Sequence, residues 1–262
     1  MPERTSYAHG TPNWVDLSTS DVAGAKSFYA AVLGWTLDDR PTDVGVPYTM
    51  AIRDGHPIAG MMPMPPDMEA NGVPPMWTTY VAVDDIDATT AAAQAAGGQV
   101  VMPTMDVMTE GRMALVADPT GAVIGLWQAG DHFGAGLVNE PGTLCWNEVQ
   151  TSDVPAAAAF YAATFGWGTQ TMDMGDQGEY TVFTVGEDGV EGGMNPSMPG
   201  IPASWSTVFA VADADATAAA ASAAGGSVMV EPFDMPIGRL TVIADPQGAV
   251  FQAIALAEPP TE

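Results

Sequence analysis

Alternation of hydrophobic and polar residues predicts the same strand at two places in the chain. The segments TPNWVDLST, starting at Thr11, and TLCWNEVQT, starting at Thr143, alternate with a period of two and lead into a Ser-Asp pair. The aspartates, Asp21 and Asp153, can accept the free N–H groups of a helix's first turn. Gly34 is placed to end the first of these helices. The apolar stripe expected on that helix is formed by Val22, Ala25, Tyr29 and Val32.

Further alternating segments follow each helix. YTMAIRDG and PIAGMMPM come after the first helix, and RMALVAD and AVIGLWQ flank a DPTG sequence later in the same half. Pro presets φ and Gly supplies a positive φ in such a sequence, which predicts a tight turn between two strands. The order β-α-β-β-β is expected four times along the chain.

The duplication covers nearly the whole sequence. Matched positions lie 127 to 132 residues apart, and they include Gly34 and Gly166, Trp77 and Trp205, and Asp118 and Asp245. A repeat of this length has the size of a domain. The prediction is therefore two tandem domains, residues 1–130 and 143–262, joined by a linker of residues 131–142 that has no strong periodicity.

Charge and composition narrow the classes of function. The formal net charge is −26, from 32 acidic and 6 basic residues, which argues against nucleic acid and anionic membrane surfaces as partners. A single cysteine, Cys145, excludes an internal disulfide framework and a cysteine-based zinc cluster. The amino terminus is polar, and no apolar run is long enough to span a membrane. We expect a soluble, cytoplasmic protein, either a two-domain monomer or a homodimer.

The motifs TPNWVDL, FYAAVLGW, IAGMMPM and GRMALVADPTGA resemble those of the vicinal oxygen chelate superfamily, which includes glyoxalase I, extradiol dioxygenases and bleomycin-resistance proteins. The tandem arrangement is similar to actinobacterial glyoxalase-like proteins often labelled hydroxylases, which include a mycobacterial culture-filtrate antigen and accessory proteins of anthracycline biosynthesis. This resemblance implies an α+β fold. Each domain would pair two βαβββ modules into an open, barrel-like cup that holds a ligand.

The resemblance also implies positions for a divalent metal, which the superfamily holds with His, Gln or Glu. The first-strand positions here are Trp14 and Trp146, and the fourth falls near Gly60 or Met61 in one half and near Gly192 or Gly193 in the other. The remaining positions are Thr78, Ser206, Gly125 and Gln252. The histidines lie in the amino-terminal tail, a turn and the linker (His9, His56 and His132), where a solvated side chain is the commoner role. We therefore expect no metal ligands and no cofactor, with a bound divalent metal as the alternative.

Residues two apart on a strand share a face, so the period predicts which side chains line each cup. In the first cup these are Trp14, Asp16, Ser18, Thr78, Tyr80, Val123 and Trp127. In the second they are Trp146, Glu148, Gln150, Ser206, Val208, Val250, Gln252 and Ile254. Aromatic walls with a few polar groups are typical of pockets for small, partly apolar molecules. The alternative is that these side chains fill the cups as core.

Four charged residues are candidates for the chemistry of the cups. A carboxylate inside an aromatic cup is costly unless paired, so Asp16 and Glu148 are candidates for an acid–base role or for ligand binding, with Glu148 favoured. Arg112 and Arg239 occupy equivalent places and could bind a ligand or hold a strand to a carboxylate. Cys145 precedes Trp146 and is expected to face away from the cup.

Two functional classes follow from these residues. The leading hypothesis is a metal-independent protein of the glyoxalase fold that binds a small, partly apolar or aromatic metabolite, for sequestration, resistance or accessory tailoring. The alternative is a lyase, isomerase or oxygenase-type enzyme that uses a divalent metal or acid–base catalysis by Glu148 or Asp16. A third possibility is that the first half serves only as a scaffold for the second.

Overall fold

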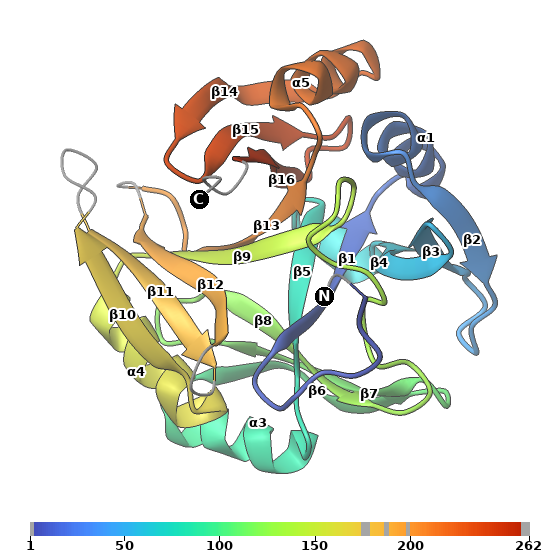
Figure 1. Cartoon of the computed structure of the whole chain (residues 1–262). Helices are drawn as coiled ribbons and strands as arrows, with labels where there is room; N and C mark the ends of the chain where they lie inside the picture. The colour runs from blue at the N-terminus through green and yellow to red at the C-terminus, as the bar shows by residue number, and fades with distance from the viewer. Residues whose placement is uncertain (1–2, 174–178, 186–188, 198–199, 258–262) are drawn as a thin grey trace.

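The computed structural model describes residues 3–173, 179–185, 189–197 and 200–257. The chain forms two open eight-stranded sheets with helices on their outer faces (Figure 1). None of the helices in these residues is both long and apolar enough to cross a membrane.

The first half forms one sheet with the strand order β2-β3-β4-β1-β5-β8-β7-β6. Its elements are β1 (Pro12–Thr19), α1 (Val22–Leu33), β2 (Thr36–Arg40), β3 (Tyr48–Arg53), β4 (His56–Pro63), α2 (Pro66–Ala70), β5 (Met76–Ala82), α3 (Ile86–Ala95), β6 (Gln99–Val107), β7 (Gly111–Ala117) and β8 (Val123–Ala129). Strands β1 and β5 pair antiparallel at the centre and join the two modules. Each is also parallel to the last strand of its own module.

The second half repeats this order as β10-β11-β12-β9-β13-β16-β15-β14. Its elements are β9 (Leu144–Thr151), α4 (Val154–Phe165), β10 (Gly168–Asp173), β11 (Glu179–Val185), β12 (Gly189–Pro196), β13 (Ser204–Ala210), α5 (Ala214–Ala223), β14 (Ser227–Met235), β15 (Gly238–Ala244) and β16 (Val250–Leu256). The predicted α+β fold of four βαβββ modules is confirmed. The short helix α2 is an addition in the connection between the first two modules.

Aspartate side chains begin the four long helices, as the pattern predicts. Asp21 accepts a hydrogen bond from the Gly24 N–H at 3.0 Å, and Asp153 accepts one from Ala156 at the same distance. Gly34 ends α1 in the left-handed conformation, with φ of 71°. The stripe on α1 differs in part from the prediction, since Val22 and Val32 are only half-buried. The fully buried positions are Ala25, Phe28, Tyr29 and Leu33, because this helix packs against both its own sheet and α5.

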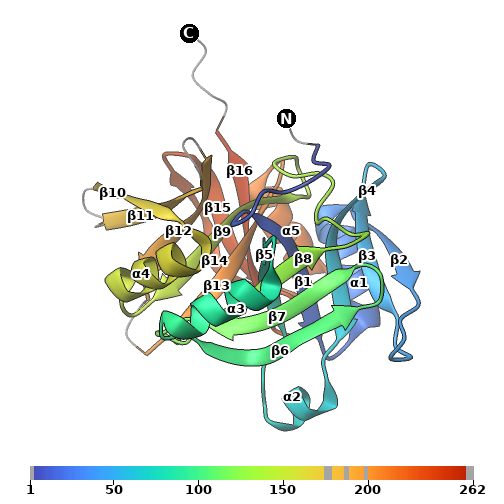
Figure 2. The ribbon, with the colours of Figure 1, turned by 90° about the horizontal axis from the view of Figure 1, so that it is seen from below.

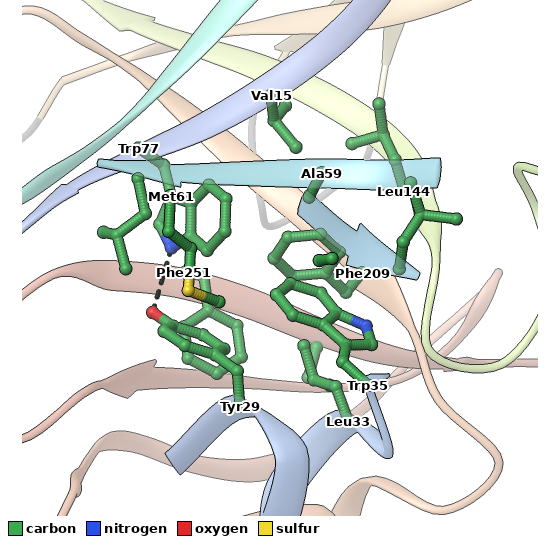
Figure 3. Packing of buried hydrophobic residues seen from close by; sticks show 14 of the residues in the cluster. Val15, Tyr29, Leu33, Trp35, Ala59, Met61, Trp77, Leu144, Phe209 and Phe251 are labelled. Carbon is green, nitrogen blue, oxygen red and sulfur yellow. Dashed lines mark hydrogen bonds between the residues drawn. The ribbon is translucent and has the colours of Figure 1, made fainter. Parts of the chain in front are cut away.

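The two largest hydrophobic cores lie between the two halves. Helix α1 packs beside α5, and α3 beside α4 (Figures 1 and 2). One core joins the first module to the fourth; it contains Trp35 from the first half and Phe209 and Phe251 from the second (Figure 3). A second core joins the second module to the third in the same way. The outer faces of both sheets are therefore buried against the other half, and the inner faces form the cups.

Matching hydrogen-bond chains lock each interdomain core. The Tyr29 hydroxyl accepts from the Trp77 indole at 3.0 Å (Figure 3). It donates to Asp245 at 3.1 Å. In the other core the Tyr161 hydroxyl donates to Asp118 at 2.9 Å and accepts from Trp205 at 2.9 Å. The tyrosine of each Phe-Tyr motif therefore contacts the aspartate of the Asp-Pro-x-Gly motif in the other half. These contacts fix the two sheets relative to each other.

Candidate functional site

Strand register places the predicted residues on the inner faces of the two sheets. Asp16 is opposite Thr78, and Trp14 is opposite Tyr80. Glu148 is opposite Ser206 in the second half. We call the inner face with Trp14, Asp16, Tyr48, Thr78, Tyr80 and Trp127 the first cup. The second cup is the inner face with Trp146, Glu148, Gln150, Tyr180, Ser206 and Gln252.

The first cup holds a buried carboxyl group among aromatic rings. Asp16 is 8% exposed, and its Oδ2 accepts from the Tyr80 hydroxyl at 3.2 Å and from the Tyr48 hydroxyl at 3.5 Å. The Trp14 indole N–H donates in turn to the Tyr48 hydroxyl at 2.9 Å. Burial raises the pKa of Asp16 to about 7, although both tyrosine hydrogen bonds act in the opposite direction. The group is therefore poised between its neutral and charged forms near neutral pH.

The linker fills the first cup. The His132 ring makes edge contacts with the rings of Trp14 and Trp127, at centroid distances of 4.4 and 5.8 Å, and its carbonyl accepts from the Trp127 indole at 2.8 Å. Ala135 and Val138 belong to the same buried cluster. Burial, followed by the charge of Arg40, lowers the pKa of His132 to about 4. His132 is thus a neutral packing residue of the first cup, where the sequence suggested a solvated loop histidine.

The second cup has the same hydrogen-bond chain in a more open setting. The Trp146 indole donates to the Tyr180 hydroxyl at 2.9 Å, which donates to Glu148 Oε2 at 3.1 Å. All three side chains are half-buried, unlike Trp14 and Asp16. Burial raises the pKa of Glu148, against hydrogen bonds from Tyr180, Asn195 and Gln252. This cup therefore presents a carboxyl group and aromatic surface that solvent can reach, with the buried Gln252 amide beside them.

One exchange of residues accounts for much of the difference between the cups. In the first cup Tyr80 is paired with Gly125, and the tyrosine ring occupies the space that a side chain at Gly125 would need. In the second cup the corresponding pair is Val208 and Gln252, and the Gln252 amide donates to the Ser206 hydroxyl at 3.1 Å. In the second cup, Val208 thus stands in place of a tyrosine, and Gln252 stands in place of a glycine.

The arginine candidates lie outside both cups. Arg112 forms ion pairs with Asp87 at 2.9 Å and Asp106 at 3.3 Å. Arg239 forms the equivalent pairs with Asp215 and Asp234. Both guanidinium groups lie on the helix-covered face and tie the first turn of α3 or α5 to an edge strand. This arrangement matches the structural role considered for them and not ligand binding within a cup.

The side chain of Cys145 points in a different direction from the one predicted. A β-bulge in β9 lets Trp146 pair with Val208 while Leu144 pairs with Phe209, so Cys145 has no partner in the alternation. Its side chain packs with Trp146 against the apolar cluster of the second cup, and its thiol contacts the Val208 carbonyl at 3.4 Å. The expectation that Cys145 faces away from the cup is therefore wrong. Burial raises the pKa of its thiol to about 12, which keeps the thiol protonated at neutral pH.

Sequence reasoning missed Tyr48 and Tyr180 as cup residues. They come from β3 and β11 and link each tryptophan to its carboxyl group. Their signal was present, because Tyr48-Thr49 and Tyr180-Thr181 recur at the same spacing as the first strands. The glycines opposite the carboxyl groups, Gly60 and Gly193, were expected only as vacant metal positions.

The family model described as Glyoxalase/Bleomycin resistance protein/Dioxygenase superfamily matches residues 11–126 and 141–253. The chain belongs to this superfamily. A similar protein of Mycobacterium tuberculosis (strain CDC 1551 / Oshkosh), named "Putative glyoxylase CFP32", is 50% identical over 256 residues, which cover 97% of this chain and 98% of that one. "Anthracycline biosynthesis protein DnrV" of Streptomyces peucetius is 38% identical over 266 residues, which cover 97% and 96%.

Solved structures of the superfamily share the fold at low sequence identity. The Mn(II)-bound glyoxalase from Novosphingobium aromaticivorans has a TM-score of 0.65 at 15% identity, covering 95% of this chain and 83% of that one. The 2,3-dioxygenase LapB from Pseudomonas sp. KL28 has the same TM-score and identity, covering 98% and 97%. At such identities the comparison establishes the fold alone.

The residues at the superfamily's metal positions do not fit a metal ion. The indole N–H groups of Trp14 and Trp146 are donors without a lone pair for a cation. Tyr48 and Tyr180 hydroxyls fill the space in front of Gly60 and Gly193, where a ligating side chain would have to stand. No group of three or more His, Cys, Asp or Glu side chains among the residues that the structure describes could hold an ion.

Proposed function

We propose that this protein binds a small, partly apolar or aromatic molecule in its second cup without a metal ion, for sequestration, resistance or accessory tailoring of a metabolite. The observation that carries the proposal is the contrast in exposure. Trp146, Glu148 and Tyr180 are half-buried and accessible, whereas in the first cup the linker packs on Trp14, and Asp16 is buried.

The wall of the second cup suits a ligand with a flat apolar body. Trp146 offers aromatic surface, and Phe233 and Val250 remain 39% and 43% exposed on the flanking strands β14 and β16. Covering this exposed apolar surface with a ligand removes it from water, which favours binding. The Glu148 carboxyl group and the Gln252 amide then supply the polar contacts that orient such a ligand.

Native mass spectrometry on protein purified without chelator tests this proposal. We expect a retained organic mass, or a thermal shift with a library of small aromatic molecules, that is lost in Trp146→Ala. Asp16→Asn, in the covered cup, is the matched control and keeps the ligand. A stoichiometric nickel, zinc or manganese adduct restored by adding the metal back would contradict metal-independent binding, as would a library in which no compound raises the melting temperature.

A second candidate function is acid–base catalysis by Glu148. Its raised pKa and partial exposure are features of carboxyl groups that exchange protons with a bound substrate. Glu148→Gln would then abolish turnover while leaving binding largely intact, since the amide keeps the hydrogen bond to Tyr180. Unchanged activity and affinity in both Glu148→Gln and Asp16→Asn would exclude this role.

A further inference from the structure

A cavity of about 260 Å³ lies beside the second cup, between the amino-terminal segment, the linker and the start of β9. Trp146 and Cys145 belong both to its wall and to the apolar cluster of the second cup. The other lining residues are Arg4, Tyr7, Pro12, Val138, Asn139, Leu144 and Asn147. Its walls are thus mainly polar, with one guanidinium group and two amides beside the aromatic rings of Tyr7 and Trp146.

Arg4 differs from the other basic residues of the chain. The remaining five each have a carboxylate within 4 Å; they are Lys26, Arg40, Arg53, Arg112 and Arg239. Arg4 has no carboxylate partner among the residues that the structure describes, and its Nε is buried without a hydrogen-bond acceptor. Among the described residues, the one arginine that lacks a carboxylate within 4 Å therefore lines a cavity.

The backbone holds Arg4 in this place. Its N–H donates to the Gly136 carbonyl at 3.0 Å, and the neighbouring residue Glu3 forms a bridge with Leu137. The guanidinium carbon lies 5.9 Å from the centre of the Tyr7 ring, a cation–π distance. The Tyr7 hydroxyl is fixed to the Ala135 carbonyl at 2.7 Å. The arginine is therefore positioned by the fold and keeps donor capacity for an anion.

We propose that this cavity is an anion subsite of the second cup, in which Arg4 binds the carboxylate of a small aromatic monoacid whose ring lies against Trp146. The inference rests on the proposed function, because Trp146 belongs both to this cavity and to the second cup. A guanidinium group matches a carboxylate with two parallel N–H donors, and Arg4 is half-buried, which reduces competition from water. The net charge of −26 disfavours polyanions at long range, so a ligand with a single charge fits best.

The first half lacks this subsite because the linker occupies the corresponding side of its tryptophan. The His132 ring contacts the Trp14 ring at 4.4 Å, and the Asn13 amide donates to the Phe133 carbonyl at 3.0 Å. Asn13 stands at the bulge of β1, as Cys145 does in β9. The anion subsite therefore belongs to one half only.

Calorimetric titration with a matched pair of probes, 2-naphthoate and the neutral 2-naphthamide, tests the inference. Wild-type protein should bind the carboxylate about 10- to 100-fold more tightly, as expected for a charge-assisted hydrogen bond. Arg4→Gln should remove that preference without weakening naphthamide binding, and Arg4→Lys should keep part of it. Arg53→Gln is the matched control, since Arg53 lines a separate cavity between α1 and α5 and should leave the preference intact.

The outcomes separate this inference from the proposed function. Equal binding of the two probes by wild type, or a preference that survives in Arg4→Gln, would overturn the anion subsite while the second cup stays a binding site. Binding of neither probe would overturn both. Melting curves of the variants establish that each is folded before it is titrated.

Discussion

The two cups of this protein are built from the same repeated unit and differ in what covers them. Each has a tryptophan that donates to a tyrosine hydroxyl, which donates to a carboxyl group. In the first cup the linker packs His132 onto that arrangement, and in the second the same groups stay half-exposed. The two halves thus share the same arrangement of strands and hydrogen bonds. In the first cup, the linker and a few different side chains bury this arrangement in a hydrophobic cluster.

The difference also explains how a fold built around metal ligands can dispense with them. Each tyrosine hydroxyl occupies the space in front of a glycine and hydrogen-bonds the nearby carboxyl group. Such a buried network satisfies polar groups that would otherwise be costly. The first cup uses this network for stability, and we propose that the second keeps it accessible to a ligand.

The largest expected effect comes from removing the two cup tryptophans in turn. Trp14 is 5% exposed and packs against His132 and Tyr80, so Trp14→Ala should lower the free energy of unfolding by about 3–5 kcal/mol. Trp146→Ala should cost clearly less, because its ring is half-exposed. Urea denaturation of both variants measures the difference. Equal costs would show that the second cup is packed as tightly as the first.

The next effect is a difference in pH dependence. The pKa of Asp16 is about 7 in the folded protein and near 3.8 when unfolded, so the unfolded state releases its proton first as pH rises. The free energy of unfolding therefore falls as pH rises from about 4 to 7. Asp16→Asn should make this fall smaller by about 2–4 kcal/mol. Denaturation midpoints at pH 5 and pH 8 measure it.

Glu148→Gln is the comparison for this pH effect. The pKa of Glu148 is raised in the same direction, so its stability contribution also falls with rising pH, and to a smaller extent because water reaches the group. If the stability of Asp16→Asn changes with pH in parallel with that of wild type, Asp16 does not have a pKa near 7 in the folded protein.

The sequence was sufficient to predict the elements of the four modules and their order, but not the short helix α2. Period-two alternation, the capping aspartates and the repeat are local or linear signals, and they located the strands that carry Trp14 and Glu148. The filling of the first cup by His132 was not predictable, since an aperiodic linker gives no sign of where it packs. The position of Cys145 failed for a related reason, because a bulge shifts the alternation by one residue and is not visible in composition.

The partners of the interdomain locks were also beyond sequence reasoning. Tyr29 meets Asp245 from the other half, although the repeat within one half gives equal reason to expect Asp118. Motifs that recur in both halves identify equivalent residues, but they do not indicate which copies touch. Only the packing of α1 beside α5 decides this pairing.

A smaller effect, equal in the two halves, is expected at these locks. Tyr29→Phe and Tyr161→Phe each remove a buried hydroxyl that links an indole to a carboxyl group, which should cost about 1–3 kcal/mol. Because the surroundings are alike, the two costs should agree within error in urea denaturation. Clearly unequal costs would mean that the asymmetry of the molecule extends from the cups to the interdomain cores.

The smallest effect is expected from the outer arginines. Arg112 and Arg239 pair with exposed carboxylates on the helix-covered face, so Arg112→Gln and Arg239→Gln should leave ligand affinity unchanged and shift the melting temperature only slightly. Titration with any ligand of the second cup measures this, with Arg4→Gln as the positive control. A loss of affinity in Arg239→Gln alone would place part of the ligand outside the inner face of β15, and the contrast between the cups would then have to include the outer surface of the second sheet.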